Sequence, residues 1–440
     1  MEVAFPRIVE TDHGLELGRK AAIRVARANR TFCLTIAQAP AIITAMITRA
    51  ITDELNRAAA EYPVVTILGP RQSGKTTLAR MTFPEMPYRS LEDPDVRMAA
   101  EADPRGFLGE MDRGGILDEV QRLPALLSYI QGLVDQSRQR RFILTGSHQP
   151  RLHEAISQSL AGRTAMLTLW PFSLAELRGY QKAYDPFDLI RGGFFPRLHE
   201  EGLEPRRFFN GYLQTYVERD VRALIQLRNL SQFQQFLTLL AGRVGQVVNL
   251  ASLGSDVGAS GTTIRSWLSV LKASHVVFEL PPFFANIRKR VIKSPKIFFT
   301  DVGLAAFLLG IHTPDQASRD PLRGSLYENL VMADVMKGAL NKGIRPDLSF
   351  FRDSHGNEVD LLINERGVLT PVEIKSAATF SPDFVKNLEW LQTVGIKRLA
   401  AGTVLYNGAQ PFHVRGVRAL NPLQVDDLWA TLMGPSHPGT

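Results

Sequence analysis

The chain has 440 residues and a mass of 48.9 kDa, which at about 100 to 200 residues per domain favours two to four domains over one. Hydrophobic residues make up 45% and charged residues 22%, so long disorder, collagen and coiled coil are disfavoured as the main architecture. The formal net charge of +7 permits a polyanionic partner but does not require one.

The apolar runs, the cysteine content and the first 45 residues indicate the compartment of the protein and where its fold begins. No apolar run reaches the roughly 18 to 20 residues of a membrane helix, so no membrane partner is expected. The single cysteine, Cys33, excludes an intramolecular disulfide and favours a reducing, cytoplasmic compartment over secretion. Residues 1–45 are predicted to be an extension outside the fold. Whether they belong to the native protein stays open, because Met46 begins a self-contained amphipathic segment.

From Pro63 the pattern alternates between buried strands and polar helical stretches, as a parallel sheet with crossover helices requires. The first expected strand, 64–68, runs directly into Gly-Pro-Arg-Gln-Ser-Gly-Lys-Thr at 69–76, which has the P-loop spacing G-x4-G-K-[ST]. Backbone N–H groups of such a loop wrap phosphates, while Lys75 reaches the β- and γ-phosphates and Thr76 offers its hydroxyl to Mg²⁺. The predicted nucleotide-binding residues of the loop are Gly69, Pro70, Arg71, Gln72, Ser73, Gly74, Lys75, Thr76 and Thr77.

The next two expected strands, 115–117 and 141–144, end in polar residues. Asp118 is predicted to hold Mg²⁺ and Glu119 to act as the general base that polarises the attacking water. Two acids at a strand end can be a solvated terminus, but their place after a P-loop favours ATP hydrolysis. Ser147 ends the later strand and would bring a hydroxyl beside the γ-phosphate.

Arg163 lies just before the strand expected near Ala165. In that position it can act as a finger that stabilises the transferring phosphoryl group at a neighbouring subunit's nucleotide, which would make the protein a homo-oligomer. The alternative is an ordinary surface arginine.

Seven motifs occur in order: GPRQSGKTTL, GGILDEVQRLP, FILTGS, SLAGR, PFSLAEL, GGFFPR and YVERDV. This series resembles the prokaryotic AAA-type ATPases described only as ATP-binding proteins, from about Met46 almost to the C-terminus. The resemblance implies an ATPase core, a helical lid, a winged-helix-like section and a nuclease-like C-terminal domain. The second aromatic residue within Gly192–Pro196 departs from the usual pattern. It weakens the assignment of Arg197 as a second sensor arginine.

A helix-turn-helix pattern follows between Gln246 and Thr300. Asn249 is expected to cap a helix that ends near Val257, and Ser260 a second helix that ends near Lys272. The stretch 280–300 then holds five basic residues and no acids, as expected of a wing against a phosphate backbone. The predicted DNA-binding residues are Thr262, Thr263, Arg265, Arg288, Lys289 and Arg290. The alternative is a protein contact or a charged, solvated edge strand.

The C-terminal region holds a second chemical constellation. Glu328 lies on an expected helix, Asp360 on a strand, and Glu373 and Lys375 on the next strand. The three carboxylates are predicted to bind Mg²⁺, and Lys375 to activate water or stabilise phosphorane charge. The pattern resembles the PD-(D/E)xK phosphodiesterase superfamily. The alternative is an inherited nuclease fold that binds DNA or a partner without cleavage. Glu358 is expected to be a surface residue.

The sequence therefore predicts an α/β protein that hydrolyses ATP with Mg²⁺, acts on DNA, and has a possible C-terminal phosphodiesterase. The alternative is a nucleotide-gated switch or scaffold that binds a protein partner. The expected parts are an extension (1–45), a P-loop ATPase core (46–180), a helical lid (181–245), a winged-helix-like segment (246–320), a nuclease-like domain (321–433) and a flexible tail (434–440).

Overall fold

The architecture is that of a computed structural model of the whole chain. The residues that it describes are 22–28, 31–37, 46–137, 139–147, 150–180, 184–217, 229–283 and 294–434. They fall in two compact units, Met1–Met46 and Ile47–Thr440. In the first unit, β1 (Ala22–Ala28) and β2 (Thr31–Ala37) pair as an antiparallel hairpin. The predicted extension thus contains regular structure of its own.

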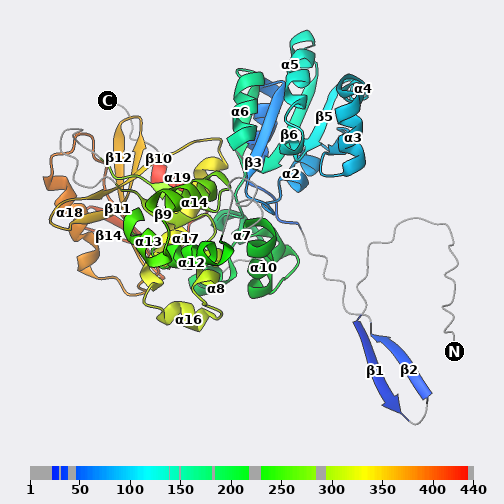
Figure 1. Ribbon diagram of the computed structural model, residues 1–440. Helices are drawn as coiled ribbons and strands as arrows, with labels where there is room; N and C mark the ends of the chain where they lie inside the picture. Colours follow the sequence, from blue (N-terminus) through cyan, green and yellow to red (C-terminus); the bar gives the residue numbers. More distant parts are fainter. Residues whose placement is uncertain are drawn as a thin grey trace. The chain divides into compact units, whose positions relative to one another are not determined.

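The second unit begins with a parallel sheet, drawn in blue to cyan in Figure 1. Its strands are β3 (Val64–Gly69), β4 (Tyr88–Ser90), β5 (Gly114–Asp118), β6 (Arg141–Ser147) and β7 (Thr164–Thr168). The spatial order is β4-β5-β6-β3-β7, and all four strand pairs are parallel. The predicted alternating α/β pattern is confirmed. Because β6 lies between β3 and β5, the ends of all three strands meet at one edge of the sheet.

Helices cover both faces of this sheet. Along β3, Val64 and Leu68 pack into one apolar cluster, and Val65 and Ile67 into the other. This is why the strand has a continuous apolar sequence instead of an alternating one. One face is covered by α1 (Thr52–Glu61) and α2 (Lys75–Thr82). The other is covered by α3 (Pro94–Ala102), α4 (Pro104–Gly109), α5 (Leu126–Gln136) and α6 (Pro150–Ser159).

A helical region follows the sheet. Its first helices are α7 (Leu174–Tyr180), α8 (Pro186–Gly192), α9 (Pro196–Glu200) and α10 (Pro205–Tyr212), followed by a π-helical turn, Leu213–Val217. Three of these helices begin with proline, whose fixed φ and missing N–H suit a first helical turn. Within the described residues, no helix is both long enough and apolar enough to cross a bilayer.

The predicted helix-turn-helix elements are present at the expected residues. They are α13 (Leu250–Val257) and α14 (Gly261–Ala273), followed by an antiparallel pair, β8 (Val277–Leu280) and β9 (Lys296–Phe299). Helix α12 (Leu230–Ala241) precedes them. Asn249 and Ser260 cap α13 and α14 through their side chains, as predicted. Gly258 ends α13 at φ 72°, a left-handed conformation that favours glycine.

The C-terminal region builds a second, mixed sheet, drawn in orange to red (Figure 1). Its helices are α15 (Val302–Leu308), α16 (Pro314–Arg319), α17 (Arg323–Leu340), a 3-10 turn (Pro382–Val385), α18 (Lys386–Thr393) and α19 (Leu428–Met433). Its strands are β10 (Asp347–Arg352), β11 (Glu358–Glu365), β12 (Val368–Lys375), β13 (Thr403–Tyr406), β14 (Phe412–Val414) and β15 (Val417–Leu420). The order is β10-β11-β12-β13-β15-β14. Residues of α17 and α18 pack in different apolar clusters with residues of this sheet.

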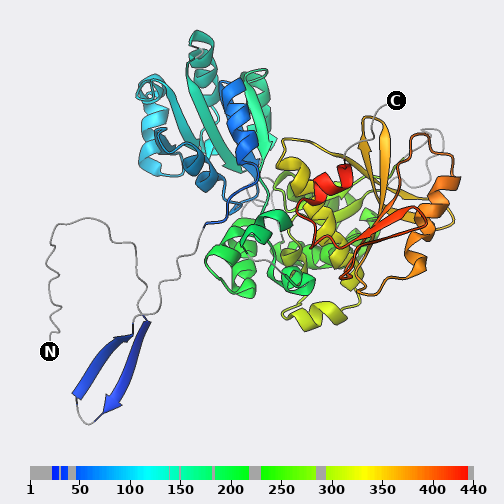
Figure 2. The same cartoon turned by 180° about the vertical axis from the view of Figure 1, so that it is seen from behind.

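One apolar core crosses the predicted boundary between residues 320 and 321. It contains buried residues of α8, α10, α12, α14, β9, α15, α17 and the second sheet. The end of β8 is also joined to β10, since Phe283 N donates to Phe350 O at 2.7 Å and Phe350 N to Pro281 O at 3.0 Å. The opposite view shows these elements as one body (Figure 2). The helical, middle and C-terminal segments therefore share packing and are not separate modules.

Candidate functional site

The phosphate-binding loop connects β3 to α2, as the sequence predicted. A Cβ atom at Gly69 would lie 2.1 Å from the carbonyl oxygen of Leu169, the residue directly after β7, so this position requires glycine. Gly74 adopts φ 90° at the start of α2. Ser73 is buried and donates its hydroxyl to Pro70 O at 3.0 Å, which closes the loop on itself.

Lys75 lies within this loop, with 5% of its surface exposed. Its ammonium donates to Pro70 O at 2.8 Å and Gly69 O at 3.3 Å. The positive charge is therefore held at the carboxyl end of β3, where a P-loop lysine meets phosphate. The neighbouring Thr77 is exposed.

Asp118, at the end of β5, accepts hydrogen bonds from three hydroxyl groups. Its Oδ1 accepts from Thr76 at 2.8 Å and also from Thr145, while its Oδ2 accepts from Tyr88 at 3.0 Å. Burial, followed by the Asp118 charge, raises the pKa of Tyr88 to about 12, so the phenol stays a donor. Sequence reasoning missed Tyr88, because the short edge strand β4 has no strong apolar pattern.

Glu119 follows Asp118 and has φ 57°, which is unusual for a residue with a side chain. Its Oε2 lies 4.0 Å from Arg71 Nη1 and accepts a hydrogen bond from Gln121. Its backbone N–H donates to Thr145 Oγ1 at 3.4 Å. The predicted base is thus placed between the loop and the end of β6.

Ser147, at the end of β6, pairs in register with Gly69. Its Oγ is buried and has no hydrogen-bond partner among the described residues. Buried hydroxyl groups are normally hydrogen-bonded, so an unmatched one beside the loop suits a group that meets a ligand. Thr145, two residues earlier on β6, binds Asp118 instead.

Arg163 lies at the opposite end of the sheet from the loop, since its carbonyl accepts from Val64 N at the start of β3. Its guanidinium binds Asp135 of α5 through both Nε at 2.6 Å and Nη2 at 2.9 Å. This pairing holds the pKa of Asp135 below its usual value. Arg163 therefore does not reach the nucleotide site of its own chain. Arg197 pairs with Glu201 on α9 at 2.9 Å.

The C-terminal constellation is only partly assembled. Lys375 Nζ lies 2.6 Å from Glu373 Oε1 and 3.5 Å from Asp360 Oδ2, which also accepts from Ile374 N at 2.8 Å. Glu373 is 2% exposed, and its Oε2 has no hydrogen-bond partner among the described residues. Burial, followed by the nearby Asp360 charge, raises the pKa of Glu373 to about 8.

Glu328 is engaged elsewhere. Its Oε1 accepts from Lys296 of β9 at 2.9 Å, and Lys296 also lies 2.6 Å from Glu358. Across the described ranges, no group of three or more His, Cys, Asp or Glu side chains is arranged to hold a metal ion. The role of Glu328, Asp360 and Glu373 as metal ligands stays a prediction. The charge of Asp360 acts on both other carboxyl groups and adds to the burial that raises the pKa of each. The buried Lys296 ammonium pairs with Glu328 and offsets its charge.

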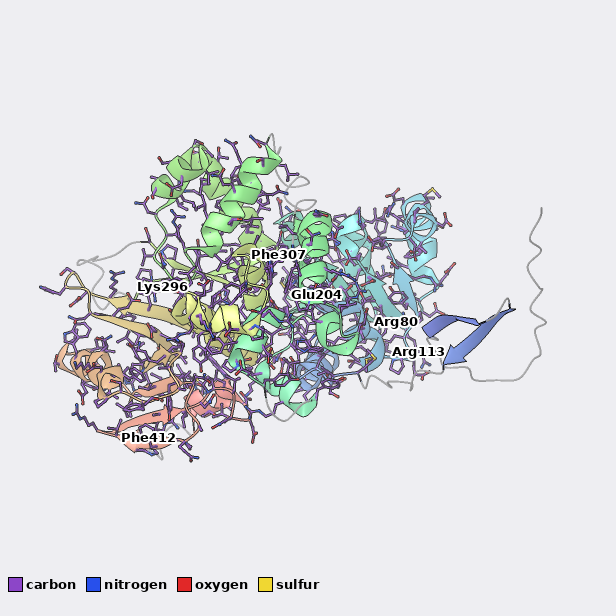
Figure 3. All side chains as sticks on the ribbon, turned by 90° about the horizontal axis from the view of Figure 1, so that it is seen from below. Arg80, Arg113, Glu204, Lys296, Phe307 and Phe412 are labelled. Carbon is purple, nitrogen blue, oxygen red and sulfur yellow. The ribbon has the colours of Figure 1, made fainter. Side chains whose placement is uncertain are left out.

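Two expectations for neighbouring residues are wrong. Glu358 is not a surface residue, since its side chain is 24% exposed and is paired with both Lys296 and Arg352. Lys296, one of the five basic residues of the predicted wing, is 2% exposed and points into the C-terminal part instead of toward solvent. Figure 3 labels Lys296 beside the strands of the second sheet. The carboxylates that hold it come from α17 and β11, distant in sequence.

The predicted DNA-reading face of α14 is exposed in part. Thr262 and Arg265 are exposed, and Thr263 is half-buried with its hydroxyl 2.8 Å from that of Ser260. The other predicted DNA contacts, Arg288, Lys289 and Arg290, lie outside the described residues.

The parallel sheet, the phosphate loop and the acids at the end of β5 define the class of protein. Residues 61–178 match the AAA domain family, so the chain contains an AAA-type P-loop ATPase domain. Residues 185–315 and 323–424 match two families, each described as a domain of unknown function, DUF8612 and DUF4143.

The wider family follows from two mycobacterial relatives, the uncharacterized protein Rv2008c of Mycobacterium tuberculosis and Mb2031c of Mycobacterium bovis. Each is 33% identical over 329 residues, which cover 74% of this chain and 73% of the relative. The chain belongs to the family of these two proteins. Among solved structures, the Walker-type ATPase PABY2304 of Pyrococcus abyssi is similar, with 19% identity and a TM-score of 0.39. The similarity covers 59% of this chain and 94% of that one.

Proposed function

We propose that the chain is a Mg²⁺-dependent ATP hydrolase. The observation that carries the proposal is the 2.8 Å hydrogen bond between Thr76 Oγ1 and Asp118 Oδ1, because it joins the phosphate loop to the acid at the end of β5. A hydroxyl and a carboxylate oxygen side by side suit Mg²⁺, which prefers oxygen ligands. Thr76 and Asp118 would hold the ion, which would supply charge to offset that of the phosphates.

The remaining residues have separate roles in this proposal. The Lys75 ammonium binds the β- and γ-phosphates, and the Ser147 hydroxyl donates to the γ-phosphate. Glu119 orients the attacking water and accepts its proton as the water oxygen bonds to phosphorus, with ADP as the leaving group. Arg163 of a neighbouring copy would stabilise the charge of the transferred phosphoryl group, which is why its position far from its own loop is compatible with a role.

Phosphate release in the presence of ATP and Mg²⁺ tests this proposal. Glu119→Gln should retain ATP binding and lower kcat by about 10² to 10⁴, the usual contribution of a general base. Lys75→Ala should lose both ATP binding and ATP hydrolysis. Glu110→Gln is the matched control, because Glu110 is an exposed acid that pairs with Arg89 at the surface. Wild-type turnover by Glu119→Gln would contradict the assigned role of Glu119.

We further propose that DNA is the macromolecule on which the ATPase acts. The support is the exposed start of α14, where Thr262 and Arg265 face solvent and the helix carries no acidic residue. DNA-stimulated ATP hydrolysis is the direct measurement. Binding should fall steeply with added salt, because counterion release dominates phosphate contacts. It should weaken in Arg265→Ala and in the Arg288/Lys289/Arg290 triple alanine variant, but not in Arg319→Ala on α16.

A second candidate function is a nucleotide-gated switch or scaffold for a protein partner, with a nuclease-like domain that does not cleave. The observation that favours it is Lys296, whose ammonium binds Glu328 and Glu358. Because Lys296 pairs with Glu328, one of the three predicted ligands, no metal-dependent step is derived for this domain. What still supports a phosphodiesterase is the contact of Lys375 with Asp360 and Glu373.

Nicking of supercoiled plasmid with Mg²⁺ or Mn²⁺ separates these candidates. Nicking that is lost in both Asp360→Ala and Lys375→Ala would support the phosphodiesterase. Nicking that survives both substitutions would indicate a contaminant. The absence of nicking, together with ATP hydrolysis that DNA does not stimulate, would favour the switch.

A further inference from the structure

A buried arginine outside the P-loop motif contacts the phosphate-binding loop. Arg49 precedes α1 and lies outside residues 61–178, the part that matches the AAA domain family. It is 9% exposed, and its Nη1 donates to Ser73 O at 2.7 Å. Its Nη2 donates to Trp170 O, after β7, also at 2.7 Å. One guanidinium group thus joins two segments that are far apart in sequence.

The contact with Ser73 O has a consequence for the next residue. A trans peptide unit is planar, so its C=O and N–H groups point in opposite directions. When Arg49 holds the Ser73 carbonyl, the N–H of Gly74 is directed away from Arg49. In P-loops the backbone N–H groups bind the phosphates, so the orientation of this peptide decides how well one donor is aligned.

Arg49 is itself held in place. Its Nε donates to Glu176 Oε1 at 2.9 Å, and its guanidinium lies 5.0 Å from the centre of the Phe172 ring. Glu176 also accepts from Ala50 N at 2.8 Å and from Ser173 N at 2.7 Å. The planar fork of arginine can donate to three acceptors in fixed directions, which the single ammonium of lysine cannot do.

We propose that Arg49 is a positioning residue for ATP: it fixes the Ser73–Gly74 peptide so that the Gly74 N–H is preorganised for a bound phosphate. The inference rests on the proposed ATP hydrolysis and adds a residue to that site. Loss of the contact weakens the binding of ground state and transition state alike. The expected result is therefore a higher KM with an unchanged kcat.

The test compares wild type, Arg49→Lys, Arg49→Met and the control Arg57→Met in the full chain. Arg57 is an arginine on α1 whose side chain is 67% exposed. We expect Arg49→Lys to keep the charge beside Glu176 but to weaken binding of both ATP and ADP about tenfold, with KM raised to match and kcat retained. Arg49→Met should weaken binding at least as much. Arg57→Met should behave like wild type.

The thermal midpoint of each variant without nucleotide reports any loss of stability. If Arg49→Met does not fold, Arg49→Lys decides the outcome. Wild-type affinity and KM in a folded Arg49→Lys would overturn the proposal, even if its midpoint falls. A loss of kcat with unchanged KM would also overturn it. If wild type itself neither binds nor hydrolyses ATP, the proposed function fails first, and that outcome is distinct from a failure of Arg49 alone.

Discussion

Three hydroxyl groups, from Thr76, Thr145 and Tyr88, fix the Asp118 carboxylate between α2, β6 and β4. A carboxylate held on both oxygens cannot rotate freely, so its lone pairs keep a set direction. Thr76 belongs to the phosphate loop and Thr145 also accepts from the Glu119 N–H, whereas Tyr88 lies on the edge strand β4, outside the loop. This separation allows the orienting role to be tested without altering the loop.

Tyr88→Phe removes the hydrogen bond to Asp118 Oδ2 and leaves the ring in place. We expect kcat for ATP hydrolysis to fall about 3- to 10-fold, ATP affinity to stay within about twofold, and stability to fall by about 1 kcal/mol. The pKa of Tyr88, raised to about 12, keeps the phenol protonated below pH 10. The ratio of wild-type to variant kcat should therefore be constant from pH 6 to pH 9. A ratio that changes with pH, or an equal effect of Tyr129→Phe on α5, would contradict the assignment.

Lys296 provides a second test at the scale of a residue, because its buried ammonium faces Glu328 and Glu358. Lys296→Met should lower the free energy of unfolding by about 3 to 5 kcal/mol, since removing this cation leaves the largely buried Glu328 carboxylate uncompensated. Lys272→Met is the control, because the Lys272–Glu279 pair at 2.7 Å is about one-third exposed. That pair should be worth no more than about 1 kcal/mol. Urea unfolding measures the loss of stability in both variants. Equal losses of stability in the two variants would contradict the prediction that the buried pair contributes more than the partly exposed one.

Helix α17 carries buried charged side chains that contact the segment after β7. Asp334 accepts from Leu174 N at 2.7 Å, and Lys337 donates to Phe172 O at 2.9 Å and lies 3.9 Å from the centre of the Phe194 ring. Both side chains are buried, so α17 is joined to the segment after β7 by charged groups without contact to solvent. The same helix carries Glu328.

The buried ammonium on α17 predicts a pH dependence of stability. Burial lowers the pKa of Lys337 from its usual value of 10.5 to about 8, against the opposing charges of Asp301 and Asp334. Between pH 8 and pH 10.5 Lys337 binds its proton more tightly in the unfolded chain than in the folded chain, so its contribution to stability rises with pH. From pH 7 to pH 9.5 we expect a gain of about 2 kcal/mol from this group, which is lost as pH falls through 8. Denaturant unfolding at both pH values checks it. The free energy of unfolding of wild type minus that of Lys337→Met should rise by this amount, because the other titrating groups, among them Glu373 with its pKa of about 8, are common to both chains. A difference that does not change with pH would refute the cause.

Elements with a strong local signal could be predicted from the sequence. The apolar strand before the loop, the strand that ends in Asp118, and the caps Asn249 and Ser260 are all local patterns, and the structure places them at those residues. Tyr88, Arg49 and Lys296 could not be found in this way. The residues that they contact lie 24, 30 and 62 residues away along the chain for Arg49, Tyr88 and Lys296 in turn, and no spacing rule connects them. Lys296 was misjudged because a basic stretch does not show which of its members is buried.

At the scale of the whole molecule, one apolar core ties the helical, middle and C-terminal segments together. Buried side chains of α12, α14 and α15 share this core with those of α17 and the second sheet. The sequence favoured a boundary at residues 320 and 321 because the pattern changes there from helical to α/β. Packing does not follow that change, since the segment directly after β8 is hydrogen-bonded to β10 through Phe283 and Phe350.

The shared core predicts how truncated chains behave. A chain that ends at Asp320 loses α17, with the buried residues Leu326, Tyr327, Leu330 and Val331, so the remaining helices would expose a large apolar surface. We expect this chain to aggregate or to show no cooperative unfolding beyond residue 180, and to lose ATPase activity because the contact of Asp334 with Leu174 is removed. A chain that ends at Gly434 keeps the whole core and should unfold like the full chain. Calorimetry and size-exclusion chromatography compare the two. A monomeric chain ending at Asp320, with a cooperative transition and wild-type turnover, would show that the middle segment has a core of its own.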